Sequence, residues 1–595
     1  MKILIEDGVI LKEEQGERWR IDLQRLPDLH VPTTLTAVLQ ARLDALPEAE
    51  RVALQQAAVV GRIFWDVVIQ VLQAADQPPE TALKGLARRE LIYPREASAF
   101  VGTEEFIIKH ALLRDVVYES VLKRLRRVYH HKTAEWLAET TESNGRVEEY
   151  AALIASHYDK ASEELPAAEW YIRAGKRAKV QGALQEASMA FNRALELLPE
   201  SEDNLYWSAL YERSKVFGMI GDSEGLRQDA QMLLKLAQES NDVDRLAEAN
   251  VRWGVYLSGL GNESDAIPVF KTALAAARQK GNGDLEAKIL GMLTISLTRT
   301  GEIDAAATIA EEALQRVHDI KEEPTVSNVL INIAVCFGES GNISRAITLI
   351  LQAIDINHRL GDRYGELVCL SNVGYDYVSL GLLEQGITAL KQSMQIAEGI
   401  GARRTRLYSQ LNLGLAYLRH AELTKAQRLL EDTLTEMAAV RDEFARAACL
   451  AYLALAFELS GKAAEAAEHY TQARELFNHL GILAYAHDSL AGLARCALSR
   501  GEAATALEYA SQLWNDLSQK GSQGMEFPIW AYLTCAQVFE ATGDSDRCHR
   551  ALKAGYADLM ARAEKISTLE WRASFLSNIP EHQDLTAWHQ KVQIQ

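Results

Sequence analysis

Three asparagines occupy the same position of a sequence pattern that recurs every forty residues: Asn332, Asn372 and Asn412. A side-chain amide carries both a donor and an acceptor, so a row of amides on one surface can hydrogen-bond the backbone of an extended peptide whatever its sequence. The alternative is that each amide makes a polar contact between helices and only sets their packing. We assign the three asparagines, together with Tyr375, to a predicted groove that binds a peptide or protein.

The sequence contains none of the short motifs that mark common catalytic sites. It has no G-x-x-x-x-G-K-[ST] loop to hold the β- and γ-phosphates of a nucleotide, and Gly175-Lys176 and Gly461-Lys462 lack the upstream glycine. It also has no H-E-x-x-H, no G-x-S-x-G and no cluster of metal ligands. We therefore expect a chain that is not an enzyme and that has no metal and no cofactor of its own.

The composition is that of a folded protein, with 48% hydrophobic residues and a formal net charge of −19. Such an excess of acids disfavours general nucleic-acid binding, which needs clustered Lys and Arg. The six cysteines form no C-x-x-C pair and are predicted to be buried or half-buried thiols. The sequence has neither a signal peptide nor an apolar run of about eighteen residues. We expect a cytoplasmic protein with no membrane span.

The predicted groove residues are positioned by a helix-turn-helix unit that repeats over two thirds of the chain. Glycines mark the turn inside each unit at Gly221, Gly261, Gly301, Gly341, Gly381, Gly461 and Gly501, with His420-Ala421 in the one missing place. A second set marks the turns between units at Gly281, Gly361, Gly401, Gly481 and Gly521. A fixed period of this size indicates a solenoid of stacked helix pairs, each burying its apolar face against its neighbours.

Within each unit, small residues recur where two helices must approach closely, and a bulky apolar residue stands three places after the first of them. In one unit these positions are Gly254, Leu257 and Ala266. Apolar residues recur at spacings of three and four, which is typical of an amphipathic helix. The expected fold is mainly α: an α-solenoid of about ten forty-residue helix pairs, with two helices of roughly seventeen residues in each.

Residues 31–128 have a different pattern. Three helices are expected within residues 31–75, broken at Leu46-Pro47 and at Gly61, and another from Pro79 to Arg89. The segments LIYPRE and EEFIIKH then read as two short strands on either side of residues 97–103, and a helix follows. Helices followed by a two-stranded wing predict a small winged-helix domain. Acidic residues crowd the start of its second helix, so we do not expect it to bind DNA.

The repeats and the region before them resemble two known families. Gly254, Ala266, Phe270 and Ala273 match the tetratricopeptide repeat, although the period of forty exceeds its usual length of about 34 residues. The segments PTTLTAVLQARLDALP, AAVVGRIF and FIIKHALLRDVVYESVL resemble the winged helix of signal-transduction ATPases with numerous domains. Members of that family carry a P-loop ATPase module, then a winged helix, then tetratricopeptide repeats.

This resemblance implies a nucleotide-sensing role for His110 and Arg114. In the family, a histidine that begins the last helix of the winged domain contacts the ADP phosphate and holds the resting state. His110 in the segment KHALLRD matches that histidine, and Arg114 follows the pattern, whereas Lys109 and Ala111 replace the flanking residues of the eukaryotic version. The role requires an ATPase module upstream in the same protein, with ATP or ADP bound there. The alternative is a histidine that caps or packs at the strand–helix junction.

The predicted domains are the end of an ATPase module or linker (1–30), the winged helix (31–128), connecting helices (129–160), the tetratricopeptide superhelix (161–562) and a C-terminal helical cap (563–595). They predict the sensor segment of a signalling ATPase. Its repeats would bind a peptide or protein, and its winged helix would couple binding to nucleotide state. The alternative is a stand-alone interaction scaffold. A transcription regulator is disfavoured by the charge and by the lack of room for a C-terminal DNA-binding domain.

Overall fold

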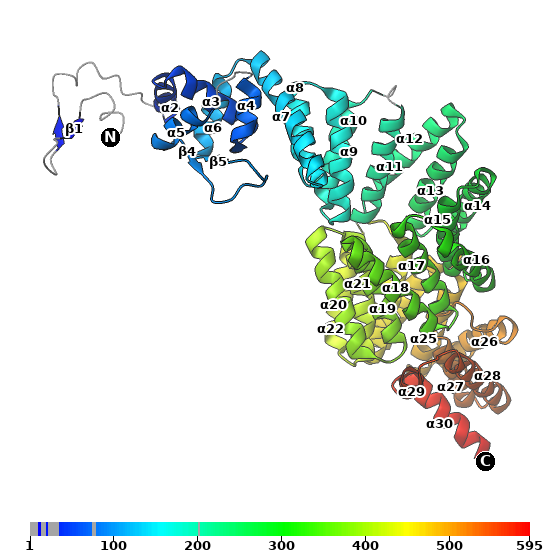
Figure 1. The fold of residues 1–595 in the computed structure, drawn as a ribbon. Helices are drawn as coiled ribbons and strands as arrows, with labels where there is room; N and C mark the ends of the chain where they lie inside the picture. Colours follow the sequence, from blue (N-terminus) through cyan, green and yellow to red (C-terminus); the bar gives the residue numbers. More distant parts are fainter. Residues whose placement is uncertain are drawn as a thin grey trace. The chain divides into compact units, whose positions relative to one another are not determined.

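The computed structural model of this protein describes residues 10–12, 19–21, 35–73, 79–199, 203–438 and 440–594. The chain forms two compact units (Figure 1). Unit 1 comprises Met1–Ala174 and Arg193–Tyr206, and unit 2 comprises Gly175–Asn192 and Trp207–Gln595.

Unit 1 contains a small antiparallel sheet packed among short helices. Its first elements are α2 (Leu35–Asp44), α3 (Glu48–Val60), β3 (Ile63–Trp65), α4 (Asp66–Gln73), α5 (Glu80–Arg88), β4 (Ile92–Pro94), β5 (Glu105–Ile108) and α6 (Ala111–Ser120). The central strand β5 pairs with β3 and with β4, in the registers Ile63↔Ile107 and Ile92↔Ile108. Strands β4 and β5 lie in the two segments predicted as strands. Strand β3 was not predicted, because its residues run directly into α4 and were assigned to that helix.

The first thirty residues were predicted as the end of an ATPase module, and most of them lie outside the described residues. The exceptions are β1 (Ile10–Lys12) and β2 (Trp19–Ile21), which form an antiparallel pair.

The core of unit 1 joins the sheet to the helices that follow it, α7 (Lys123–Ser143) and α8 (Val147–Ala161). The ring of Trp65 lies 4.9 Å from that of Phe100 and 5.5 Å from that of Trp136, measured between centroids. The indole of Trp65 donates to the buried carboxylate of Glu105 at 3.0 Å. An aromatic cluster of this kind buries a large apolar area, so α7 is fixed against the sheet.

Two buried histidines connect α7 to α8. Their Nδ1 atoms, on His130 and His157, are 2.9 Å apart, and the Tyr118 hydroxyl lies 3.0 Å from Nε2 of His130. Burial lowers the pKa of both imidazoles below the usual 6.5, and for His130 the neighbouring His157 lowers it further. Both rings are therefore neutral at pH 7, with one Nδ1–H donating to the other Nδ1. Helices α9 (Glu164–Val180) and α10 (Leu184–Leu197) follow, and the boundary between the units crosses both.

Among the described residues, α11–α28 form nine consecutive helix pairs, which belong to unit 2 apart from residues 203–206 at the start of α11. The first helices of the pairs are α11 (Asp203–Ile220), α13 (Val243–Gly259), α15 (Gly283–Arg299), α17 (Glu323–Glu339), α19 (Arg363–Ser379), α21 (Arg403–Arg419), α23 (Glu443–Leu459), α25 (Leu483–Ser499) and α27 (Pro528–Ala541). The second helices are α12 (Ser223–Ser240), α14 (Glu263–Lys280), α16 (Ile303–Arg316), α18 (Ile343–Leu360), α20 (Leu383–Ile400), α22 (Leu423–Met437), α24 (Ala463–His479), α26 (Ala503–Lys520) and α28 (Ser545–Glu564). Most starts are forty residues apart, which confirms the predicted α-solenoid of tetratricopeptide-like pairs. The six cysteines are all buried free thiols, as predicted.

The turn inside each pair has a left-handed residue where the sequence predicted glycine. Gly261 has a φ of 84°, its amide donates to Ser258 O, and the next amide donates to Leu257 O. Glycine suits this position because it has no Cβ to clash with the backbone. Ala421 takes the same conformation in the pair that lacks the glycine, with a φ of 59°.

The period breaks once, between α26 and α27. Gly521 was predicted to end α26 like the other turn glycines, but its ψ of −165° places it in a different conformation. Helix α27 begins at Pro528, five residues later than the period requires, and the extra residues form the connection 521–527. After α28, the helices α29 (Leu569–Ser577) and α30 (Pro580–Ile594) end the chain.

Successive turns of the superhelix touch within unit 2. The amide of Glu443 in α23 donates to Leu260 O at 3.3 Å, which joins two helix pairs that are five places apart. Four more hydrogen bonds connect residues 197 to 225 positions apart: Ser223 Oγ to Val440 O, Lys565 Nζ to Ser340 O, Ser567 N to Ser344 Oγ and Asn578 Nδ2 to Gly381 O. In Figure 1 the helices near α25 accordingly lie behind α17–α19. The first helices of the pairs thus surround a common interior.

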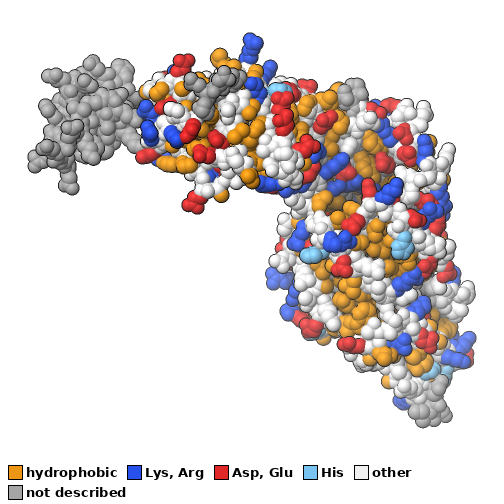
Figure 2. All heavy atoms as spheres, viewed as in Figure 1, with side chains coloured by type: hydrophobic (Ala, Val, Ile, Leu, Met, Phe, Trp, Pro, Cys, Tyr) orange, Lys and Arg blue, Asp and Glu red, His pale blue; other side chains and the backbone are white. Residues whose placement is uncertain are grey.

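The described surface carries both signs of charge. On the face shown in Figure 2, Lys and Arg side chains are interspersed with Asp and Glu side chains over both units, and no continuous basic surface is seen there.

Candidate functional site

The predicted groove asparagines lie on three neighbouring first helices, α17, α19 and α21. Two residues after each asparagine stands the small residue that packs against the second helix of the same pair. At Gly414, for example, an added Cβ would lie 2.6 Å from Leu430 of α22. Two residues correspond to about 200° of rotation around a helix, so the asparagine points to the opposite side. That side is the interior of the superhelix.

Asn332, Asn372, Asn412 and Tyr375 all line one cavity of about 450 Å³. The first helices of the pairs contribute most of its wall, from Gly218 in α11 to Tyr485 in α25. The structure therefore brings the four predicted groove residues together. We refer to this space as the inner cavity.

The three amides face the inner cavity without partners of their own. Each asparagine is half-buried, and no described residue donates a hydrogen bond to its side chain or accepts one from it. Gly291 in α15 leaves the room that Asn332 occupies, because a Cβ there would lie 3.3 Å from the amide nitrogen. Amides that set helix packing would be hydrogen-bonded to the neighbouring helix. The geometry thus favours amides that are available to a ligand.

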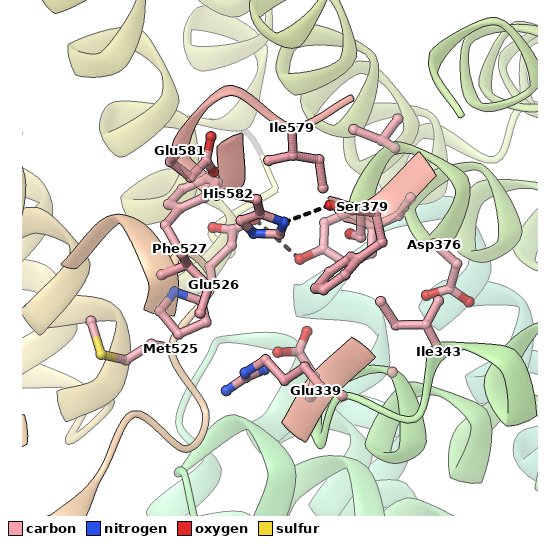
Figure 3. A pocket seen from close by; sticks show the side chains of 18 of the residues that line it. Glu339, Ile343, Asp376, Ser379, Met525, Glu526, Phe527, Ile579, Glu581 and His582 are labelled. Carbon is pink, nitrogen blue, oxygen red and sulfur yellow. Dashed lines mark hydrogen bonds between the residues drawn. The ribbon is translucent and has the colours of Figure 1, made fainter. Parts of the chain in front are cut away.

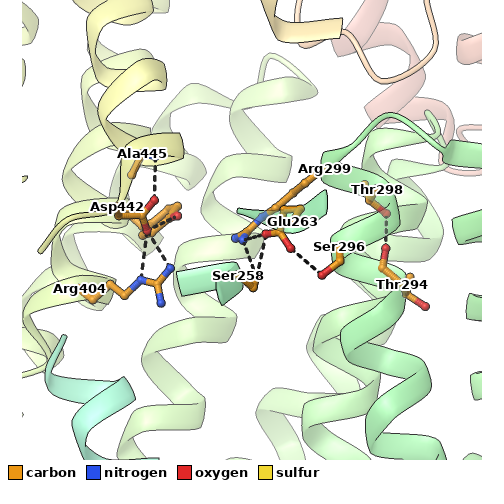
Figure 4. Close-up of polar contacts among 10 residues, drawn as sticks. Ser258, Glu263, Thr294, Ser296, Thr298, Arg299, Arg404, Asp442 and Ala445 are labelled. Carbon is orange, nitrogen blue, oxygen red and sulfur yellow. Dashed lines mark hydrogen bonds and ion pairs between the residues drawn. The ribbon is translucent and has the colours of Figure 1, made fainter. Parts of the chain in front are cut away.

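One side of the inner cavity carries arginines that are already paired (Figure 4). Arg299 lies 2.7 Å from Glu263, a fully buried acid that also accepts hydrogen bonds from Ser258 and Ser296. Arg404 lies 2.8 Å from Asp442, which also accepts from the Tyr408 hydroxyl at 2.9 Å. Their charges are therefore balanced within the wall.

Three acidic side chains line another part of the inner cavity, which we call its acidic end. Glu339 at the end of α17, Asp376 in α19 and Glu526 in the connection 521–527 line both the inner cavity and a smaller pocket of about 90 Å³ beside it (Figure 3). Oε1 of Glu526 accepts a hydrogen bond from Tyr375 at 3.2 Å and another from Tyr452. The hydroxyl of Tyr375 is thus engaged with Glu526 as well as lining the cavity.

These acidic side chains hold their protons more tightly than usual. Burial raises the pKa of Glu339 to about 8, and the charge of Glu526 raises it as well, whereas Arg562 lowers it. Burial raises the pKa of Glu526 to about 7, although the Tyr452 and Tyr375 hydroxyls oppose the shift. Burial, followed by the charge of Glu339, raises the pKa of Asp376 well above its usual value. Near pH 7 this end of the cavity therefore holds both protons and negative charge.

Glu526 is held in place by an acid from the preceding pair. Asp488 in α25 accepts hydrogen bonds from the backbone amides of Glu526 at 2.8 Å and Phe527 at 3.1 Å. The five extra residues of the connection thereby turn a carboxylate into the interior.

The two residues predicted to sense a nucleotide belong to unit 1. His110 is exposed and stands at the N-terminal end of α6, and among the described residues none hydrogen-bonds to its ring. Arg114 is committed to the fold, because its Nε donates to Ala58 O of α3 at 2.9 Å and its guanidinium lies over the Tyr118 ring. The structure thus leaves His110 accessible and makes Arg114 a connection between α6 and α3.

Sequence reasoning missed the acidic end of the inner cavity. Glu339 lies seven residues after Asn332 and Asp376 four residues after Asn372, so each shares a helix face with a predicted asparagine. That spacing was the available signal. Glu526 had none, because it lies where the forty-residue period breaks.

Two further properties concern the described residues as a whole. In this part of the chain no three His, Cys, Asp or Glu side chains are grouped so that they could hold a metal ion. Across the same residues, every helix is too short or too polar to cross a membrane.

The chain is similar to several solved structures. A signal transduction ATPase with numerous domains (STAND) protein with a tetratricopeptide repeat sensor, from Pyrococcus horikoshii, is 16% identical with a TM-score of 0.44, over 75% of this chain and 66% of that protein. A Rap protein complexed with Competence and Sporulation Factor is 12% identical with a TM-score of 0.42, over 58% of this chain and 99% of that one. NprR in complex with its cognate peptide NprX is 10% identical with a TM-score of 0.39, over 64% and 98%. No protein-family model and no curated protein matches the sequence.

Proposed function

We propose that this chain binds a peptide or an extended protein segment in the inner cavity of unit 2. The observation that carries the proposal is the row of three asparagine amides on consecutive first helices, all facing the cavity and all without hydrogen-bond partners among the described residues. An amide offers a donor and an acceptor, as each peptide unit of a ligand does.

The spacing of the row suits an extended chain. Packed helices lie about 8–10 Å apart, and an extended peptide advances about 3.3 Å per residue. Amides on neighbouring helices would therefore meet peptide units roughly three residues apart. These hydrogen bonds recognise the backbone of the peptide, while the aromatic and acidic residues of the cavity wall select its side chains.

A binding experiment tests the proposal. Fluorescein-labelled hexapeptide pools of random sequence are titrated with the full chain, with a variant that has Ala at Asn332, Asn372 and Asn412, and with a control that has Ala at Asn328, Asn478 and Asn515. The control asparagines are exposed on α17, α24 and α26, away from the cavity lining. Each hydrogen bond contributes about 1 kcal/mol, so the first variant should bind roughly a hundredfold more weakly and the control should bind normally. Equal binding by both variants would show that Asn332, Asn372 and Asn412 do not bind the peptide.

We further propose that unit 1 is a winged helix through which ligand binding is coupled to the nucleotide state of an ATPase module in the same protein. Three features support this role: the three-stranded sheet after a group of short helices, the exposed ring of His110 without a partner among the described residues, and the fixed position of Arg114. A neutral or protonated imidazole can donate to a phosphate oxygen.

Nucleotide release tests the coupling. In the protein encoded by the complete reading frame, His110→Ala should release bound ADP faster, whereas His131→Ala, on the neighbouring helix α7, should not. Unchanged ADP release would assign His110 to the fold alone. A complete protein that retains no nucleotide would instead be an interaction scaffold.

A further inference from the structure

The acidic end of the inner cavity has more negative groups than positive partners. Glu339, Asp376 and Glu526 line it from two helices and one connection (Figure 3), and no Lys or Arg among the described residues forms an ion pair with any of them. The arginines nearby are already paired: Arg299 with Glu263, Arg419 with Glu581 and Arg562 with Asp558.

Asp376 differs from an ordinary surface acid, whose carboxylate is solvated by water. It is only 6% exposed, it lines the cavity, and no described residue hydrogen-bonds to its carboxyl group. Burying a polar group without a partner costs free energy, so such groups are rare unless a ligand satisfies them. Glycine at position 338 keeps the space beside this carboxyl open, because a Cβ there would lie 3.2 Å from Oδ1.

We infer that this end of the inner cavity binds a cationic group of the peptide, either an Arg or Lys side chain or its amino terminus. The inference rests on the proposed peptide-binding function and specifies one position of the ligand. A guanidinium or ammonium group supplies the donors that Asp376 lacks and the positive charge that the three carboxyl groups need.

The position of the cationic group along the peptide follows from the helix. Glu339 comes seven residues after Asn332 on α17, which is about 10 Å along the axis. An extended peptide covers that distance in roughly three residues. The cationic residue therefore lies within about three residues of the segment that the asparagines hold.

Binding should release protons. Glu339 faces Glu526, Arg562, Tyr485 and Arg299, and retains its proton near pH 7 because its pKa is about 8. Glu526 faces Tyr452, Tyr375 and Arg419, with Asp488 beside it. A bound cation favours the charged carboxylates, so the carboxyl groups release protons when the peptide binds. The affinity for the peptide therefore rises as the pH increases from about 6 to 8.

The test compares arginine with citrulline, which has the same shape and no charge. Random hexapeptide pools with acetylated amino termini carry either residue at one fixed position and are titrated with the full chain at pH 7.5. We expect the arginine pool to bind at least tenfold more tightly, with proton release measured by calorimetry in two buffers of different ionisation enthalpy. Asp376→Asn and Glu339→Gln should each reduce the difference at least threefold. The control variant Glu398→Gln removes an exposed charge on α20 and should leave the difference between the two pools unchanged.

The outcomes separate the inference from the proposed function. A citrulline pool with free amino termini that binds as tightly as the arginine pool, and is weakened by Asp376→Asn, would identify the terminus as the cation. Equal binding of all pools, lost in the triple asparagine variant, would overturn the inference and leave the proposed function standing. Binding of no pool would overturn the proposed function and the inference with it. Because the arginine–citrulline comparison uses the unaltered chain, it remains decisive if a variant fails to fold.

Discussion

The hydroxyl of Tyr375 donates a hydrogen bond of 3.2 Å to Oε1 of Glu526, which lies 151 positions further along the chain. Tyr375 belongs to the fifth of the nine pairs, α19/α20, and Glu526 to the connection before the ninth. Tyr452, in the seventh pair, donates to the same carboxylate. One acid thus ties three distant parts of the repeat array together at the wall of the inner cavity.

Removing one of these donors should shift the titration of Glu526. Tyr375→Phe deletes a hydrogen bond that favours the charged carboxylate, so the pKa of Glu526 should rise above about 7, by roughly one unit for a bond of about 1.5 kcal/mol to a charged group. The measurement is infrared difference spectroscopy of the protonated carboxyl band that Glu526→Gln removes. Tyr377→Phe, on the same helix, should leave the band unchanged. A midpoint that does not move would show that Tyr452 alone holds the carboxylate.

Replacing Glu339 should change how stability depends on pH. The folded-state pKa of about 8 lies above the ordinary value of 4.5, so the folded chain keeps a proton that the unfolded chain releases. This contribution is complete below pH 4.5 and is lost as the pH rises through 8. Relative to the natural chain, Glu339→Gln should therefore gain stability between pH 5 and pH 9, by up to about 4 kcal/mol, or about 1.4 kcal/mol for each of the three pH units from 5 to 8. Urea unfolding of both chains at pH 5 and at pH 9 measures the change. A difference in the free energy of unfolding that is the same at the two pH values would contradict the shifted pKa.

Where the small position of the repeat is glycine, as it is at Gly254, it should not accept even one methyl group. At Gly254 an added Cβ would lie 2.5 Å from the Phe270 ring, so Gly254→Ala forces the two helices of the pair apart. We expect a loss of about 1–3 kcal/mol in the free energy of unfolding. Gly399→Ala is the matched control, because nothing lies within 4 Å of the added atom and the helix gains roughly 0.5–1 kcal/mol. Similar losses for both would mean that the contact with Phe270 is not the cause.

The turn at Ala421 offers a stabilising substitution. Its φ of 59° is unfavourable for a residue with a Cβ. The other described pairs have a glycine with a positive φ at the same turn. Ala421→Gly should raise the free energy of unfolding by about 1 kcal/mol, in part offset by the entropy of the unfolded glycine. Thermal unfolding measures the change. The reverse substitution Gly461→Ala, where φ is 78°, should lower the stability by a similar amount.

Acid should open the contact between α7 and α8 before it affects the middle of unit 2. The pKa of His130 and of His157 is lowered by burial, so the unfolded chain binds more protons than the folded one below pH 6.5. The contribution of the two neutral rings to the free energy of unfolding is complete above pH 6.5. It is lost as the pH falls, by about 1.4 kcal/mol per pH unit for each ring. Hydrogen exchange should show falling protection in α7 and α8 between pH 6.5 and 5. Helices α19 and α20 contain no histidine and should keep theirs.

The regular part of the fold was predictable because its physics is local and repeated. The glycines at forty-residue intervals fix the turns, and small residues such as Gly414 fix the approach of the helices. The same regularity placed the three asparagines on one face. Glu526 was not predictable, because it lies in a connection with no counterpart in the other pairs. The contact between His130 and His157 was also missed, since it depends on the angle between two helices rather than on sequence spacing.

The hydrogen bonds between successive turns of the superhelix change how the array should fold. In an open solenoid each repeat contacts only its neighbours, so structure can spread step by step from any point. Here Leu260 must find Glu443, and Ser340 must find Lys565. Closing such long loops is entropically expensive and slow. The pairs should therefore form quickly as an open coil, with the closure of one turn on the next as a late and separate kinetic step.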